Sequence, residues 1–197
     1  MTTATTTWST LDQALDALHT AVAGVPADAW GRPTPCREWT VRQVVEHAAG
    51  DQHAWAATVG EAAGPSYNPF APSGSEAGSA AELVTAAVRA ANGAWPAVHP
   101  DAQEAPTPLP QGAFPPAIAA AACALDAAVH AWDVAVATGQ PSPLTDELAT
   151  ELLPAATAIA EPLRAYGVFA AVVPSAADDT PAATLLRFLG RDPHWAS

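Results

Sequence analysis

The stretch Leu125-Asp126-Ala127-Ala128-Val129-His130-Ala131-Trp132-Asp133 decides the fold, because it sets polar side chains into the most apolar segment of the chain. Asp126 and His130 stand four residues apart in an alanine-rich run. On a helix such positions lie on one face, about one turn apart. A buried charge without a partner is costly, and a metal ion bound by both side chains would remove that cost. The stretch therefore predicts a buried helix that carries part of a metal site.

Apolar residues recur every three or four positions through most of the chain, which is typical of amphipathic helices. The predicted helices run over about 9–22, 41–60, 80–98, 114–138 and 145–165. Loops rich in glycine, proline and serine separate several of them. Thr40, followed three residues later by Gln43, predicts a capping box at the start of the second helix. The sequence therefore indicates an all-α protein built as a four-helix bundle.

A single domain, or one domain with a small appendage, fits the length of 197 residues. We expect residues 1–165 to form the metal-binding helical bundle and residues 166–197 to form a C-terminal extension packed on it. This extension is predicted to be small and mixed, with a short extended piece at 169–173 and a short helix at 180–189.

The charge of the chain argues against several classes of partner. It has 20 acidic residues against seven basic ones, contains no lysine, and carries a formal net charge of −13. Phosphate backbones and anionic membranes are bound by clustered basic residues, so we expect neither nucleic acid nor a membrane as a partner, but a small-molecule substrate. No uninterrupted apolar run reaches the ~18 residues of a transmembrane span.

Residues 1–7 lack the basic and apolar regions of a signal peptide. We therefore expect a cytoplasmic protein, as a monomer or a homodimer. In that compartment Cys36 and Cys123 are not expected to form a disulfide framework.

A third metal ligand is expected from His47, which lies within the apolar stripe of the predicted helix 41–60. Two imidazoles and one carboxylate suit Zn²⁺ first, and also Ni²⁺, Fe²⁺, Co²⁺ or Mn²⁺. Three protein ligands leave coordination positions open, which is typical of catalytic rather than structural sites. The complex would keep a charge of about +1, which favours an anionic ligand such as a thiolate.

Each of these residues also has a purely structural interpretation. His47 can be a core histidine bonded to a backbone group, and Asp126 can hydrogen-bond His130 or orient it from behind. Asp133, three residues after His130, is expected to be structural, either pairing with Arg42 or capping a loop.

Four further residues are candidates for the neighbourhood of the site. Asp51, one turn after His47, can accept a hydrogen bond behind it, although a solvated helix residue is the default interpretation. Cys36 is expected to be structural rather than a reactive thiol. Trp55 and Arg191 are candidate substrate-binding residues, as an aromatic wall and a bidentate partner for a carboxylate. Alternatively, Trp55 packs in the core and Arg191 forms a surface salt bridge.

Three pieces of the sequence resemble one known family. They are Thr34–His47 with its Trp-Thr-Val…His pattern, Asp126–Gly139 with His-x-Trp-Asp-x-Ala-x-Ala-Thr-Gly, and Leu185–Trp195 with Gly-Arg-Asp-Pro. In this order and spacing they look like an actinobacterial family of metal-binding proteins in the DinB/YfiT-like superfamily. That family is related to the N-terminal domain of mycothiol-dependent maleylpyruvate isomerase. The resemblance implies a four-helix bundle that holds a divalent metal.

Carried over by position, the ligands that this resemblance implies are His47, Asp126 and His130. Relatives usually carry glutamate where this chain has Asp126, which is one methylene shorter. Direct ligation by Asp126, contact through water and no contact at all are therefore open alternatives.

The superfamily also implies thiol chemistry, either transfer or isomerisation with mycothiol as co-substrate, because a divalent metal lowers the pKa of a coordinated thiol. The alternatives are a hydrolase that uses activated water, a non-catalytic protein that binds a metal or another ligand, and recruitment to specialised biosynthesis.

Overall fold

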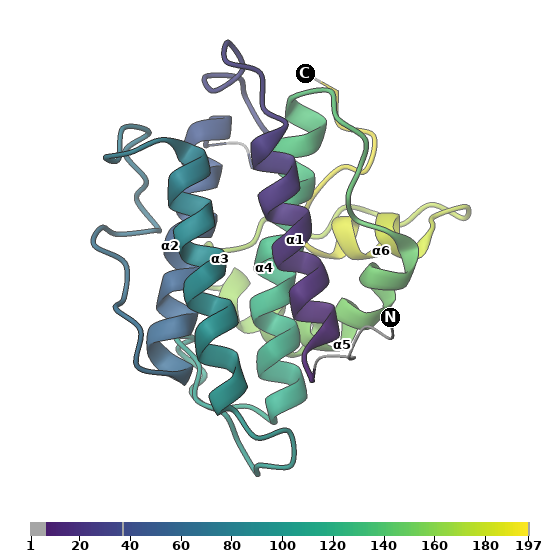
Figure 1. Cartoon of the computed structure of the whole chain (residues 1–197). Helices are drawn as coiled ribbons and strands as arrows, with labels where there is room; N and C mark the ends of the chain where they lie inside the picture. Colours follow the sequence, from purple (N-terminus) through teal and green to yellow (C-terminus); the bar gives the residue numbers. More distant parts are fainter. Residues whose placement is uncertain (1–6, 37, 197) are drawn as a thin grey trace, which may run out of the picture.

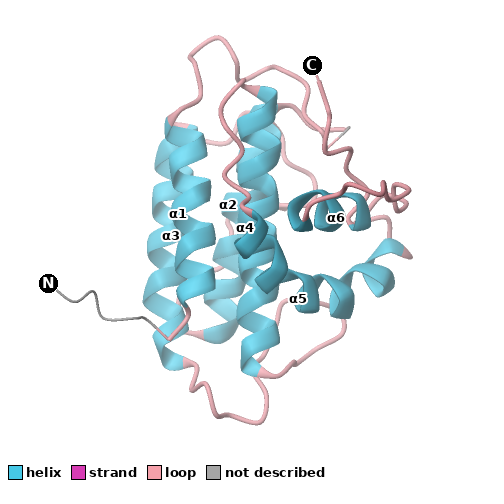
Figure 2. Ribbon diagram, turned by 90° about the vertical axis from the view of Figure 1, so that its right-hand side faces the viewer, coloured by secondary structure: helices cyan, strands magenta, loops and turns pink. Residues whose placement is uncertain are grey.

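The computed structural model describes residues 7–36 and 38–196. Its elements are α1 (Ser9–Ala23), α2 (Val41–Val59), α3 (Ala80–Ala94), the short 3₁₀ helix η1 (Trp95–Ala97), α4 (Pro116–Ala137), α5 (Asp146–Arg164) and α6 (Pro181–Phe188). The first four α-helices stand side by side, and α5 and α6 lie to one side of them (Figures 1 and 2). No strand occurs among the described residues. The predicted all-α, DinB-like four-helix bundle is confirmed.

The four bundle helices form two parallel pairs. α2 and α3 begin together, since Arg42 donates a hydrogen bond to the carbonyl oxygen of Gly78 at 3.1 Å. α1 and α4 end together, since Gln140, just beyond α4, donates to the carbonyl oxygen of Ala21 at 2.9 Å. The chain must therefore return along the bundle between α2 and α3. Residues 61–79, called the long loop below, make this return beside α2 (Figure 1).

α4 is the central helix of the bundle, as its composition predicts. Of its 22 residues, 17 are buried. By length and composition it would also suit a membrane span, but most of its apolar stretch is buried inside the protein. It is not an uninterrupted apolar run of the kind expected for a transmembrane span, because Asp126, His130 and Asp133 lie within it. Its many alanines let neighbouring helices approach closely, so these polar groups meet side chains from other helices.

Side-chain caps fix where α2 and α3 begin. The Thr40 hydroxyl accepts a hydrogen bond from the backbone N–H of Gln43, whose side chain accepts from the Thr40 N–H. This confirms the predicted capping box. Ser79 and Glu82 form a second capping box at the start of α3. The long loop is therefore held between a capped helix start and the body of α2.

The C-terminal part of the chain packs on the bundle through α5, which contacts α4 and α6 (Figure 2). α6 confirms the predicted short helix. Residues 169–173 run irregularly rather than as a paired strand, and the Val173 N–H donates to the carbonyl oxygen of Arg187. The domain division at residue 165 stays a prediction, and the expectation for residues 1–7 falls almost wholly outside the described residues.

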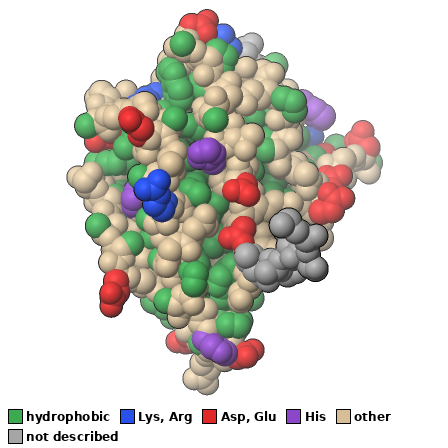
Figure 3. All heavy atoms as spheres, in the orientation of Figure 1, with side chains coloured by type: hydrophobic (Ala, Val, Ile, Leu, Met, Phe, Trp, Pro, Cys, Tyr) green, Lys and Arg blue, Asp and Glu red, His purple; other side chains and the backbone are tan. Residues whose placement is uncertain are grey.

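The surface carries charge sparsely. On the face shown in Figure 3, acidic side chains are scattered among apolar and uncharged ones, and basic side chains do not gather into a patch. This distribution agrees with a chain in which only 14% of the residues are charged.

Candidate metal centre

The structure brings the three predicted donors together between α2 and α4. His47 comes from α2, and Asp126 and His130 come from successive turns of α4. Each imidazole Nε2 lies 3.4 Å from Asp126 Oδ1, and the donor atoms all lie within 4.8 Å of one another. The three side chains are largely buried, with Asp126 the most exposed at 16%. Its shorter side chain therefore reaches both imidazoles.

Both imidazoles are oriented by a hydrogen bond at Nδ1. His47 Nδ1 lies 2.8 Å from the carbonyl oxygen of Pro69, and His130 Nδ1 lies 2.9 Å from Asp133 Oδ2. A carbonyl or carboxylate oxygen can only accept, so each Nδ1 carries the proton. In the neutral rings, the lone pair is then on Nε2 and faces Asp126. Histidine ligands of metals characteristically donate their second N–H in this way.

Facing acceptors make this arrangement suited to a cation. Two Nε2 lone pairs and a carboxylate oxygen repel one another unless a positive charge lies between them. A proton can supply this charge. Burial acts to lower the pKa of His47, but the hydrogen bond and charge of Asp126 outweigh it and raise that pKa. Burial acts to raise the pKa of Asp126, but the charge of His130 and the hydrogen bond with His47 lower it. A divalent metal can occupy the same place as the proton.

Asp126 is held by an uncharged partner behind it. Gln52, fully buried on α2, lies with Nε2 3.4 Å from Asp126 Oδ2 and 3.2 Å from the carbonyl oxygen of Cys123. Gln52 Oε1 in turn accepts from the Cys123 thiol at 3.1 Å. Oδ1 is thereby left to face the two imidazoles. Nothing in the sequence pattern singled out Gln52, because its partners lie more than 70 residues away.

Asp133 pairs with Arg191, not with Arg42 as one of its sequence interpretations had it. Arg191 Nε donates to Asp133 Oδ1 at 2.9 Å, and Nη2 donates to Oδ2 at 2.8 Å. The Asp133 side chain is fully buried and that of Arg191 is 10% exposed. Burial acts to raise the pKa of Asp133, but the Arg191 charge and the hydrogen bond with His130 lower it to about 2. The guanidinium proposed for substrate is thus engaged within the protein, and its contact with substrate stays a prediction.

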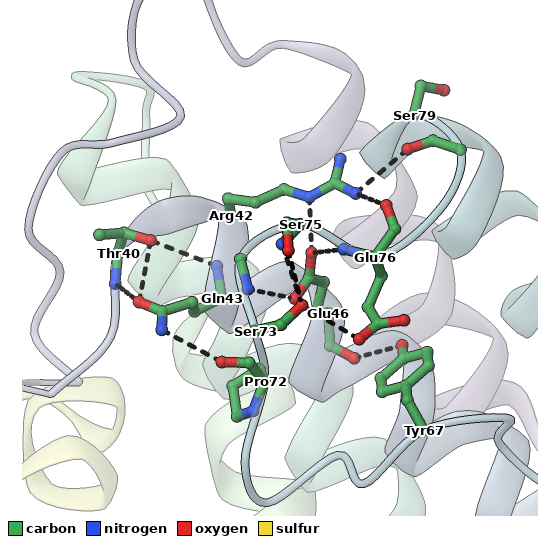
Figure 4. A network of polar contacts seen from close by, with 12 residues as sticks. Thr40, Arg42, Gln43, Glu46, Tyr67, Pro72, Ser73, Ser75, Glu76 and Ser79 are labelled. Atoms are coloured by element: carbon green, nitrogen blue, oxygen red, sulfur yellow. Dashed lines mark hydrogen bonds and ion pairs between the residues drawn. The ribbon is translucent and has the colours of Figure 1, made fainter.

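Arg42 instead pairs with Glu46, the residue before His47, on a different face of α2. The fully buried Glu46 carboxylate accepts from Arg42 Nε at 2.8 Å and from the N–H groups of Gly74 and Glu76 at 2.7 and 2.9 Å. Figure 4 shows these contacts with the Tyr67 hydroxyl, which donates to the Glu46 carbonyl oxygen at 2.6 Å. The network fastens the long loop to α2. The same loop supplies the carbonyl of Pro69, so the network helps to orient His47.

Two aromatic rings flank His47. The ring of Trp39 lies 4.7 Å from its imidazole between centroids, and that of Phe70 lies 5.5 Å away. Phe70, on the long loop, is 58% exposed. Both rings therefore contact the donor set through His47.

Trp55 and Asp51 have partners other than a ligand. Trp55 is 1% exposed, and its Nε1 donates to Asp51 Oδ2 at 3.0 Å. Its role in substrate binding stays a prediction. Asp51 is buried rather than solvated, because Trp55 and the α2–α4 packing enclose it. Burial and the nearby charge of Asp126 raise the pKa of Asp51 to about 7.

Cys36 is half-buried in the loop before α2. Burial, followed by the negative charge of Asp133, raises the pKa of Cys36 to about 12. A thiol with this pKa is almost entirely protonated at neutral pH, which favours the structural interpretation.

Comparisons with known proteins give a matching family model and two similar proteins. The family model described as "Mycothiol maleylpyruvate isomerase N-terminal domain" matches residues 11–135. Two similar proteins, each called uncharacterized, come from Mycobacterium tuberculosis strains CDC 1551 / Oshkosh and ATCC 25618 / H37Rv. Each is 38% identical over 183 residues, which cover 91% of this chain and 94% of the relative. No solved structure gives a significant match. The span matched by the family model contains His47, Asp126 and His130.

Proposed function

The chain belongs to the mycothiol maleylpyruvate isomerase N-terminal domain family, and from this premise we propose that it is a divalent-metal-dependent transferase or isomerase that uses a thiol such as mycothiol. The observation that carries the proposal is the convergence of two imidazole Nε2 atoms and one carboxylate oxygen within 4.8 Å of one another. His47, Asp126 and His130 would hold the metal.

The donor set fits a divalent transition metal. Two neutral imidazoles and one carboxylate suit Zn²⁺ first, with Ni²⁺, Fe²⁺, Co²⁺ and Mn²⁺ as alternatives. Asp126 Oδ1 lies equally far from the two Nε2 atoms, which supports direct ligation despite the replacement of the usual glutamate. A divalent metal bound there would lower the pKa of a coordinated thiol, so that a thiolate is available as a nucleophile at neutral pH.

The residues of the chain would supply orientation and charge. The Nδ1 hydrogen bonds keep both Nε2 lone pairs directed at one point. A single carboxylate among the three ligands leaves a charge of about +1, which attracts an anionic sulfur. Trp39 and Phe70 would shield the His47 side of the site from water. The proposal includes a small-molecule substrate, no nucleic-acid or membrane partner, and a cytoplasmic location.

Metal content tests the first half of the proposal. We expect protein purified without chelator, or reconstituted with Zn²⁺, to hold about one metal per chain by elemental analysis. His47→Ala and His130→Ala should remove it. His53→Ala, on α2 but outside the donor set, is the matched control and should keep it. A His130→Ala variant with full metal content would overturn the ligand assignment.

Thiol dependence tests the second half. The metal-loaded protein should consume mycothiol with an electrophilic substrate, or need it in catalytic amount for a cis–trans isomerisation. The metal-free protein should do neither. Turnover in which water replaces the thiol would indicate a hydrolase. Metal binding without mycothiol binding in calorimetry would indicate a non-catalytic binding protein. Either result contradicts the proposed thiol chemistry.

A further inference from the structure

One ion pair connects the end of the chain to the candidate metal centre. Arg191 lies beyond α6 and 58 residues after its partner Asp133. It also lies outside residues 11–135, the span that the family model matches. The contact therefore adds to the centre a residue that the matched domain does not contain.

The local backbone directs Arg191 toward α4. Gly190 has φ +82°, its N–H donates to the carbonyl oxygen of Arg187, and the N–H of Arg191 donates to that of Leu186. This is the Schellman arrangement, in which glycine ends a helix and turns the chain back. A Cβ at Gly190 would also meet the carbonyl oxygen of Ala170 at 2.8 Å. Conformation and close approach both require glycine here.

The hydrogen bonds of Arg191 hold Asp133, which is the hydrogen-bond partner of the candidate metal ligand His130. Two parallel N–H···O bonds hold both oxygens of Asp133, an arrangement that defines the carboxylate plane. Asp133 Oδ2 is also the atom 2.9 Å from His130 Nδ1. We infer that Arg191 is a positioning residue for the metal centre, and that it sets the orientation of His130 through Asp133. This inference rests on the proposed metal site.

The expected effect lies in metal affinity. Loss of an outer hydrogen-bond partner typically weakens metal binding by about 10–100-fold. Arg191→Gln loosens that partner without removing it, so it should weaken Zn²⁺ binding by up to about that factor and change the visible absorption spectrum of the Co²⁺-substituted protein, which reports ligand geometry. Arg191→Lys keeps the charge but not the paired bonds, so its affinity should fall between those of Arg191→Gln and the wild type.

The matched control is Arg187→Gln. Arg187 is also a largely buried arginine of the C-terminal segment, and it pairs with Asp179 rather than with the metal centre. Zn²⁺ affinity should be measured by competition with a chromophoric chelator, and folding by circular dichroism. Arg187→Gln should bind Zn²⁺ and show the Co²⁺ spectrum as the wild type does.

The outcomes separate the inference from the proposed function. A wild-type protein that binds no metal overturns both. A folded Arg191→Gln variant with wild-type affinity and spectrum overturns the inference alone. If Arg191→Gln does not fold, Arg191→Lys provides the test. Wild-type Zn²⁺ affinity in a folded Arg191→Lys variant would overturn the inference, because it would show that the paired hydrogen bonds are not needed. Equal losses in Arg187→Gln and Arg191→Gln would show a general effect of the C-terminal segment and overturn the inference.

Discussion

His47 and His130 both present Nε2 to Asp126, but they are held in place by different means. His47 donates to the backbone carbonyl of Pro69, a neutral group on the long loop. His130 donates to a buried carboxylate, Asp133, which is held by Arg191 from the far end of the chain. One imidazole thus depends on how a loop is fastened, and the other depends on a pair of charges. The comparison shows that two Nε2 atoms can be aimed at one point by supports with different sensitivities.

Asp126 faces both imidazoles, so its removal should have the largest effect on metal binding. Asp126→Ala deletes the oxygen that lies 3.4 Å from both Nε2 atoms. We expect stoichiometric metal binding to be lost, a larger effect than the roughly 10–100-fold of an outer partner. Asp126→Glu keeps a carboxylate at this position and should keep the metal. Elemental analysis of both variants checks this, and a metal-loaded Asp126→Ala protein would contradict it.

The support that the long loop gives to His47 should weaken when the Glu46 carboxylate is removed. Glu46→Ala leaves Arg42 and the N–H groups of Gly74 and Glu76 without their common acceptor. Breaking a buried ion pair in this way costs about 3 kcal/mol, so the free energy of unfolding in urea should fall by about that amount. Metal affinity should fall as well, because the long loop also carries Pro69. Glu61→Ala, an exposed carboxylate of the same loop, is the control and should change neither quantity.

The sequence predicted the parts of this site that follow from local periodicity. Asp126 and His130 share a helix face by spacing alone, and His47 stands out within the apolar stripe of α2. The supports were not predictable in the same way, because Asp133–Arg191 and Gln52–Asp126 join residues 58 and 74 positions apart. Such pairs depend on how the helices are arranged.

Two other expectations show the limit of local patterns. Asp51 was expected in solvent, but packing between α2 and α4 buries it beside Trp55. The parallel direction of α2 and α3 was not predicted either, since the composition of the loop at 61–79 does not give its path. Helix positions are therefore encoded locally, whereas burial of a particular carboxylate is decided by the tertiary arrangement.

The Asp133–Arg191 pair on the His130 side should respond to acid. Asp133 has a pKa of about 2, below its ordinary 3.8. A carboxyl group with a lowered pKa in the folded state contributes stability above its unfolded pKa and loses it as pH falls through the folded value. The shift corresponds to about 2 kcal/mol, lost between about pH 4 and pH 2. The Pro69 carbonyl has no proton to gain in this range.

Urea unfolding of the metal-free protein at pH 5 and pH 2.5 measures this loss of stability. The wild type should lose up to about 2 kcal/mol more than Asp133→Asn over this interval, because the amide does not titrate. The lower starting stability of Asp133→Asn does not matter, since only the change with pH is compared. Equal losses in the two proteins would show that Asp133 does not carry the acid sensitivity.

The last expected effect concerns the reactivity of Cys36, which reports the charge on the Asp133 side. A pKa raised from 9.0 to about 12 leaves about a thousandfold less thiolate at pH 7.5. Iodoacetamide should therefore modify native Cys36 at least ~100-fold more slowly than the urea-unfolded chain, as followed by peptide mass spectrometry. Asp133→Asn removes one of the causes of the raised pKa and should speed the reaction. Glu46→Ala, on the His47 side, should not. Native Cys36 reacting as fast as the unfolded chain would instead mark a reactive thiol beside the metal centre, and the two sides would then differ in chemistry as well as in support.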